Sequence, residues 1–288
     1  MASITVADQA GACYGVERAL ELVARALDEA DGPVRTLGPL IHNPKVVAEL
    51  EGRGVAVAAD TRQAPGSTIV IRSHGVAPEV IEGARARGLV VVDATCPYVK
   101  KVHHAAARLL AGGYQVIVVG EAGHPEVEGT IGHAPGAVAV ESASDLDAIE
   151  LGRRVGVVVQ TTQSAERLRE VVDALLARVE EVCVVNTICE ATSQRQQSAG
   201  ELAARSDVMV VVGGRNSGNT TRLAEICSRA CPRTHHVEGP EELEAGWFEG
   251  ARRIGLTAGA STPAAQISQV VDAIRALSPQ AGEDGHAK

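Results

Sequence analysis

Three of the six cysteines in this sequence stand directly before a helical pattern. They are Cys13, Cys96 and Cys189, and they recur at similar intervals along the chain. A thiol at a helix N-terminus has a lowered pKa, because the positive end of the helix dipole stabilises the thiolate, which is both a nucleophile and a metal ligand. These positions therefore predict metal binding or nucleophilic chemistry. The sequence contains no C-x-x-C pair, which argues against a zinc ribbon or a thioredoxin-type site.

Three histidines, His42, His74 and His124, lie in loops bounded by glycine or proline. A single loop histidine is more often a cap or a surface residue, but three in similar loops favour a shared site. Glu126, two residues after His124, can serve as a proton donor or merely stabilise the first turn of a helix, and the residues alone leave both roles open. Four histidines outside these loops are expected at the surface: His103, His104, His235 and His236.

Composition and charge restrict the partners that the chain can bind. Its 288 residues are 45% hydrophobic and carry a net charge of −9, which suits the phosphates of a nucleic acid poorly. No apolar run approaches the roughly 20 residues that span a bilayer, and no signal peptide is visible. We therefore expect a cytoplasmic protein that binds neither nucleic acid nor membrane, with cysteines used for metal binding or catalysis rather than disulfides. Cys227 and Cys231 are expected to be small apolar fillers on one helix face.

Short runs rich in valine and isoleucine alternate with amphipathic helical patterns along nearly the whole chain. The runs occupy residues 3–7, 68–71, 89–92, 114–119, 155–159, 181–185, 207–212 and 252–257. This alternation predicts an α/β protein with mainly parallel sheets. A barrel and three smaller modules both fit the number of alternations. Residues 279–288 are polar and unpatterned, which predicts a disordered tail.

Most loops rich in Gly, His, Ser, Thr and Asn directly follow a predicted strand. Because ligands bind at the carboxyl ends of strands in open parallel sheets, these loops predict one polar site. Several of them lead into helices with proline near the first position, and a helix N-terminus suits an anion. The loop GGRNSGNTTR, residues 213–222, has the chemistry of a phosphate cradle. It lacks the G-K-[ST] ending and G-x-G-x-x-G, which disfavours an ordinary nucleotide-binding fold.

Nine motifs, taken together and in order, resemble one known family. They are GACYGVERA, HNPKVV, RSHGV, DATCPYVKKVH, GHPEVEGTIG, QTTQS, NTICEATSQRQ, GGRNSGNTTRL and GLTAGASTP. The set covers roughly residues 4 to 277 and is similar to the LytB/IspH family of 4-hydroxy-3-methylbut-2-enyl diphosphate reductases. The resemblance implies three small α/β modules, at residues 1–95, 96–186 and 187–278, around a central iron–sulfur cluster. It implies one 4Fe-4S cluster with an open iron site, held by Cys13, Cys96 and Cys189.

The same resemblance implies roles for individual side chains. His124 and Thr161 match the groups near the alcohol end of the substrate, and Glu126 matches the proton source. The positions that match the diphosphate pocket are His42, His74, Ser217, Gly218, Asn219 and Ser261. Gly218 stands where many members carry a second serine, and Ala12 where a larger apolar residue is common; neither change removes a functional residue.

The implied reaction is a reductive dehydroxylation that takes two electrons and two protons and yields isopentenyl or dimethylallyl diphosphate. This is the last step of the non-mevalonate isoprenoid pathway, and a ferredoxin or flavodoxin-type partner would supply the electrons. Two other functions stay open. An iron–sulfur dehydratase would remove water without net reduction, and a small-molecule binding protein or sensor would use the same strand ends without catalysis.

Overall fold

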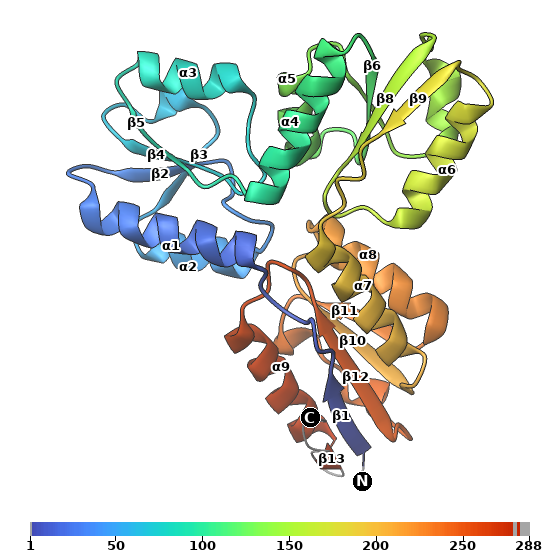
Figure 1. The fold of residues 1–288 in the computed structure, drawn as a ribbon. Helices are drawn as coiled ribbons and strands as arrows, with labels where there is room; N and C mark the ends of the chain where they lie inside the picture. The colour runs from blue at the N-terminus through green and yellow to red at the C-terminus, as the bar shows by residue number, and fades with distance from the viewer. Residues whose placement is uncertain (1, 279–280, 283–288) are drawn as a thin grey trace. The chain divides into compact units, whose positions relative to one another are not determined.

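The computed structural model describes residues 2–278 and 281–282 and contains three sheets of parallel strands (Figure 1). The predicted α/β class is thereby confirmed. The strands form three separate sheets and not a barrel. The chain divides into two compact units. The first comprises Met1–Cys13, His42–Pro44 and Glu190–Lys288, and the second comprises Tyr14–Ile41 and Lys45–Cys189.

The first unit is built on a five-stranded sheet with the order β11-β10-β12-β1-β13. The strands are β1 (Ala2–Val6), β10 (Val208–Val212), β11 (Thr234–Val237), β12 (Arg253–Ala258) and β13 (Ala281–Gly282). Its helices are α7 (Glu190–Ala203), α8 (Gly218–Ala230) and α9 (Ala264–Leu277), with short 3-10 turns at Pro240–Glu242 and Ala245–Phe248.

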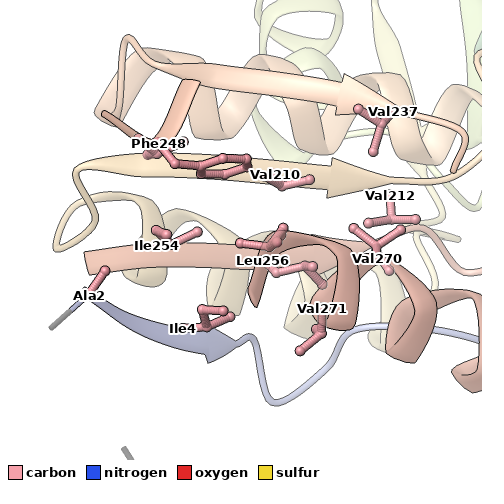
Figure 2. Close-up of a cluster of buried hydrophobic side chains, with 13 residues drawn as sticks. Ala2, Ile4, Val210, Val212, Val237, Phe248, Ile254, Leu256, Val270 and Val271 are labelled. Carbon is pink, nitrogen blue, oxygen red and sulfur yellow. The ribbon is translucent and has the colours of Figure 1, made fainter. Parts of the chain in front are cut away.

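The inner strand β10 buries both of its faces, which explains its unbroken apolar sequence. Val210 and Val212 point into one core cluster, where they pack with Leu256 and Val270 (Figure 2). Met209 and Val211 belong to a separate cluster on helices α7 and α8. Successive side chains of a strand point to opposite faces, so a strand covered on both sides must be apolar at every position.

The second unit holds two four-stranded parallel sheets, with the orders β3-β2-β4-β5 and β7-β6-β8-β9. The strands of the first are β2 (Val34–Leu37), β3 (Ala56–Ala58), β4 (Thr68–Ile71) and β5 (Val90–Asp93). Those of the second are β6 (Gln115–Val119), β7 (Val138–Val140), β8 (Arg154–Val159) and β9 (Glu181–Val184). The helices are α1 (Tyr14–Glu29), α2 (Pro44–Gly52), α3 (Pro78–Ala86), α4 (Pro97–Ala111), α5 (Pro125–His133) and α6 (Ala165–Leu176), with 3-10 turns at Thr61–Gln63 and Ala143–Ala148.

The N-terminal strand β1 pairs with strands from the C-terminal part of the chain. Strand β1 lies within the first predicted segment, residues 1–95, but pairs with β12, with Ser3 opposite Arg253. In the predicted tail, residues 281–282 form β13, and the remainder lies outside the described residues. Over the described part of the chain, no helix combines the length and apolar character needed to cross a membrane.

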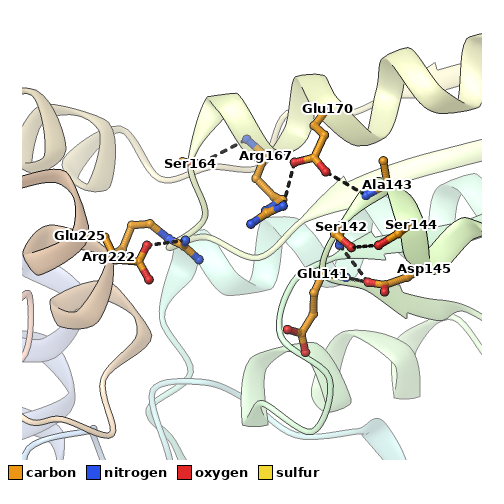
Figure 3. Close-up of polar contacts among 10 residues, drawn as sticks. All are labelled: Glu141, Ser142, Ala143, Ser144, Asp145, Ser164, Arg167, Glu170, Arg222 and Glu225. Atoms are coloured by element: carbon orange, nitrogen blue, oxygen red, sulfur yellow. Dashed lines mark hydrogen bonds and ion pairs between the residues drawn. The ribbon is translucent and has the colours of Figure 1, made fainter. Parts of the chain in front are cut away.

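Ion pairs between side chains at the surface occur in both units. In the second unit, Arg167 of α6 pairs with Glu170 at 2.7 Å, and the Glu170 carboxylate also accepts the backbone N–H of Ala143 (Figure 3). In the first unit, Arg222 and Glu225 of α8 form a similar pair at 2.8 Å. Ion pairs at a protein surface contribute at most about 1 kcal/mol each to the free energy of unfolding, so these pairs do not determine the fold.

Candidate functional site

Cys96 and His74 lie in two neighbouring loops of the second unit that are tied together through the backbone. Cys96 follows β5 and directly precedes α4, whose first residue is Pro97, as predicted. Its N–H donates to the carbonyl of Ser73 at 2.9 Å. The Ser73 hydroxyl in turn donates to the carbonyl of Leu40 at 3.0 Å. The predicted thiol therefore stands next to the loop that carries His74.

His124 caps the helix that carries Glu126. It precedes Pro125, the first residue of α5, and its Nδ1 accepts the backbone N–H of Glu126 at 3.1 Å. An accepting Nδ1 places the proton of a neutral ring on Nε2. The ring of His124 meets that of His74 edge to face, with 5.5 Å between the ring centroids. The structure thus brings these two predicted residues together.

Glu126 is buried, with 2% of its surface exposed, and its carboxyl group is held by one residue. The backbone N–H of Thr161 donates to Oε1 at 2.6 Å, and the Thr161 hydroxyl lies 2.8 Å from Oε2. Burial raises the pKa of Glu126 to about 7, although both bonds from Thr161 act in the opposite direction. A carboxyl group with such a pKa can carry and release a proton near neutral pH.

Thr161 also connects Glu126 to the third predicted cysteine. The N–H of Cys189, in the loop after β9, donates to the carbonyl of Thr161 at 3.0 Å. One residue therefore contacts the buried acid through its N–H and hydroxyl, and the cysteine loop through its carbonyl. Predicted catalytic and metal-ligating residues thus share one small region of the second unit.

Cys13, His42 and Ser261 lie in loops of the first unit that are joined by hydrogen bonds. The N–H of Cys13 donates to the carbonyl of Ala260 at 3.1 Å. The hydroxyl of the next residue, Ser261, donates to the carbonyl of His42 at 3.0 Å. The buried amide of Asn43 donates to the carbonyl of Ser261 at 2.8 Å. A thiol and two predicted diphosphate ligands are therefore placed by one network.

The N-terminus of α8 presents the remaining predicted binding residues. Ser217 is the cap, and its hydroxyl accepts the N–H of Thr220 at 3.4 Å. Gly218 is the first helical residue. Asn219 is 4% exposed, and within residues 2–278 neither its amide nitrogen nor its amide oxygen has a hydrogen-bond partner. A buried amide without a partner is costly, so these atoms are suited to a ligand that would bond them.

Comparison with known proteins decides the family. The family model described as LytB protein matches residues 4–275. The chain belongs to the LytB family. A 4-hydroxy-3-methylbut-2-enyl diphosphate reductase of Aquifex aeolicus is 47% identical over 281 residues, covering 96% of this chain and 97% of the relative. One of Geobacter sulfurreducens is 49% identical, covering 94% and 96% of the two chains.

Two solved structures of similar proteins agree with this assignment. One is the structure of (E)-4-hydroxy-3-methyl-but-2-enyl diphosphate reductase, the terminal enzyme of the non-mevalonate pathway. It is 47% identical, covers 96% of this chain and 100% of its own, and has a TM-score of 0.72. The other is a reductase from Plasmodium falciparum, which is 27% identical, covers 100% of this chain and 93% of its own, and has a TM-score of 0.91.

Membership of the LytB family implies a metal cluster, and the cysteines of this chain have the right chemistry for one. Cys13, Cys96 and Cys189 are partly buried, and none of the six cysteines, all of which the structure describes, is in a disulfide. Cys227 and Cys231 are buried, and burial raises the pKa of Cys227 to about 12, so it is a poor source of thiolate. Both cysteines fill the same apolar core cluster, as predicted, although Cys231 caps the end of α8 instead of lying on its face.

One sequence-based expectation about the histidines was wrong. His103, expected at the surface, is 4% exposed and stacks on His133, with 4.1 Å between the ring centroids. Its helix α4 buries Val99, Val102 and Ala106 on the same face, so the helical period of these residues already indicated burial at position 103.

Proposed function

We propose that this chain reduces 4-hydroxy-3-methylbut-2-enyl diphosphate to isopentenyl diphosphate and dimethylallyl diphosphate. The observation that carries the proposal is the buried carboxyl group of Glu126, which Thr161 holds with two hydrogen bonds and whose pKa lies at about 7. The relatives from Aquifex aeolicus and Geobacter sulfurreducens are named for this reaction, and the chain matches them over nearly their full length. Replacement of a hydroxyl by hydrogen consumes two electrons and two protons and releases water, so the enzyme needs a proton donor beside that hydroxyl.

Glu126 is the residue that we assign to this proton transfer. Hydroxide is a poor leaving group, whereas water leaves readily, and a buried neutral carboxyl group can donate the necessary proton. The Thr161 hydroxyl, 2.8 Å from Oε2, orients the acid and can relay a proton to it. His124 caps the same helix, with its Nδ1 engaged by the N–H of Glu126, and we assign its ring to the alcohol end of the substrate.

The diphosphate is assigned to neutral donors and histidines, in keeping with the net charge of −9. Asn219 supplies a buried amide that needs a bonding partner, at the positive end of the helix dipole of α8. Gly218 contributes only its backbone N–H there. The remaining residues proposed to bind the substrate are His42, His74, Thr161, Ser217 and Ser261.

The metal centre is proposed to be a 4Fe-4S cluster held by Cys13, Cys96 and Cys189, with one iron open. When bound, such a cluster supplies single electrons and Lewis acidity at the substrate hydroxyl. The backbone bonds at Cys13, Cys96 and Cys189 fix the loops that carry these thiols, which supports the assignment. A small electron carrier of the ferredoxin or flavodoxin type would deliver the electrons, and a cytoplasmic location would keep the thiols reduced.

The test is anaerobic purification followed by iron and sulfide analysis and product analysis with and without a reductant. We expect a brown protein that converts the substrate to isopentenyl and dimethylallyl diphosphate only when electrons are supplied. Conversion without a reductant would identify a dehydratase. A colourless protein that binds the substrate and leaves it unchanged would identify a binding protein. Either of these results refutes the proposal.

A further inference from the structure

His103 is a buried histidine that the proposed reaction leaves without a role. It lies on α4, about two turns after Cys96, and its Nε2 has no hydrogen-bond partner among residues 2–278. Burial, with the nearby His133 and His104, lowers the pKa of His103 to about 3, so the ring is neutral. A neutral ring that leaves a nitrogen unbonded serves here as a flat packing surface.

One edge of the His103 ring packs on the backbone that follows His74. A Cβ atom added to Gly75 would lie only 2.6 Å from Cε1 of His103 and 3.0 Å from Cγ2 of Thr95. Gly75 also has φ +72°, a conformation that other residues rarely adopt. The ring therefore occupies the space of a side chain at position 75, and it fixes the loop immediately after the predicted ligand His74.

The face of the His103 ring packs on His133, at the C-terminal end of α5. The two rings are nearly parallel, at an angle of 20°, and His133 forms a hydrogen bond with the backbone of Val76. Glycines of α5 let the helix approach the same segment. A Cβ atom on Gly132 would lie 2.3 Å from Cβ of Ala77, so only glycine fits at this contact.

We propose that the stacked pair His103–His133 positions the loop that carries His74 against α5, the helix that His124 caps and whose first turn carries Glu126. Four contacts converge on this arrangement: the stack, the packing on Gly75, the bond to Val76 and the approach of Gly132 to Ala77. The pair acts on the loop through Gly75 and Val76, so both residues are positioning residues. The inference rests on the proposed function, because the placement of His74 matters through the diphosphate.

The experiment compares His103→Ala, His103→Phe and His133→Ala with the wild-type holoenzyme. The readouts are KM, kcat and its pH dependence, and the dissociation constant of inorganic diphosphate by calorimetry. We expect His103→Ala to raise both KM and the dissociation constant about tenfold, because a displaced His74 loses much of a hydrogen bond to a charged group. The pH midpoint of kcat should not move, since Thr161 holds Glu126 independently. His103→Phe keeps a flat ring and should stay within about threefold of the wild type.

His235→Ala is the matched control, since His235 also stacks on a ring, that of Trp247, at 3.9 Å. It should leave KM and the diphosphate affinity unchanged. The positioning role is refuted if His103→Ala retains both constants, or if His103→Phe or His235→Ala changes them as much as His103→Ala does. If His103→Ala does not fold, His133→Ala, at a less buried position, decides by the same constants. A wild-type protein that binds diphosphate but does not reduce the substrate refutes the proposed function instead.

Discussion

Replacing Glu126 by glutamine separates the chemistry of this residue from its place in the fold. In the native site Oε1 accepts the N–H of Thr161 and Oε2 lies beside the Thr161 hydroxyl. A glutamine can keep both contacts, with its oxygen on the N–H and its amide donating to the hydroxyl oxygen, which can accept. The variant should therefore fold and bind substrate, but it has no acidic proton to deliver.

The substitution should change kcat, the pH dependence of kcat and the pH dependence of stability. Loss of a positioned general acid costs about 10²–10⁴-fold in kcat. Wild-type kcat should fall with rising pH, because a group with a pKa of about 7 is about 90% protonated at pH 6 and about 10% protonated at pH 8. The free energy of unfolding of the wild type also falls as the pH rises. The pKa is raised by folding, so the wild type loses roughly 3 kcal/mol between pH 4.5 and pH 8, a loss that the glutamine variant avoids.

The assay measures kcat, substrate affinity and unfolding free energy of both proteins from pH 5.5 to 8.5, with the same iron content in each sample. If Glu126 served only to stabilise the first turn of α5, the variant would turn over normally and lose about 0.3–1 kcal/mol of stability. Normal turnover in the variant, or a wild-type kcat that does not change through pH 7, would refute the assignment.

Three further predictions concern the metal ligands, the diphosphate and the buried histidine. Serine at any of the three predicted ligands should remove most of the iron, which analysis of anaerobic samples measures; the same change at Cys183, Cys227 or Cys231 should not, and equal loss at Cys227 would contradict the ligand set. Asn219→Ala should raise KM by about tenfold or more with full iron content, since it removes a bond to a charged group worth roughly 1.5–3 kcal/mol; an unchanged KM would place the diphosphate elsewhere. Folding lowers the pKa of His103 to about 3, well below its ordinary value. The neutral ring therefore contributes fully to the free energy of unfolding above pH 6.5, and this contribution is lost as the pH falls towards 3. His103→Phe should therefore gain up to roughly 3 kcal/mol over the wild type between pH 7 and pH 4 in thermal unfolding, and parallel curves would contradict this.

The sequence predicted the strands with unbroken apolar runs and missed several short strands. The apolar runs at 68–71 and 207–212 correspond to β4 and β10, which are covered on both faces and must be apolar throughout. Among the strands before residue 278, four short ones were not predicted: β2, β3, β7 and β11. Strands β3, β7 and β11 each lie at the edge of a sheet, whereas β2 is internal and has the polar residues Arg35 and Thr36 at its centre. An edge strand has one neighbour and tolerates exposed or polar residues, so its pattern is weak.

The site was predictable in its loops but not in its internal connections. Helix caps and strand ends directed attention to Cys96, His124 and Glu126, because these positions follow from local chain geometry. The bond from Thr161 to Glu126 joins residues 35 apart and depends on how β8 lies beside β6, which no local pattern encodes. The stack of His103 on His133 depends likewise on the packing of α4 on α5.

The pairing of β1 with β12 determines when the five-stranded sheet of the first unit can form during synthesis. Ser3 and Arg253 are about 250 residues apart, and a ribosome that adds about 5–20 residues per second needs roughly 12–50 s to make the intervening segment. Until then β1 has no partner in its sheet, whereas both sheets of residues 14–189 already have all of their strands. The N–H of Cys13 must also wait for Ala260, its acceptor. We therefore expect a nascent chain stalled before residue 250 to fold both sheets of the second unit while leaving the Cys13 loop unplaced, so that any metal centre needing this thiol would be loaded after translation ends.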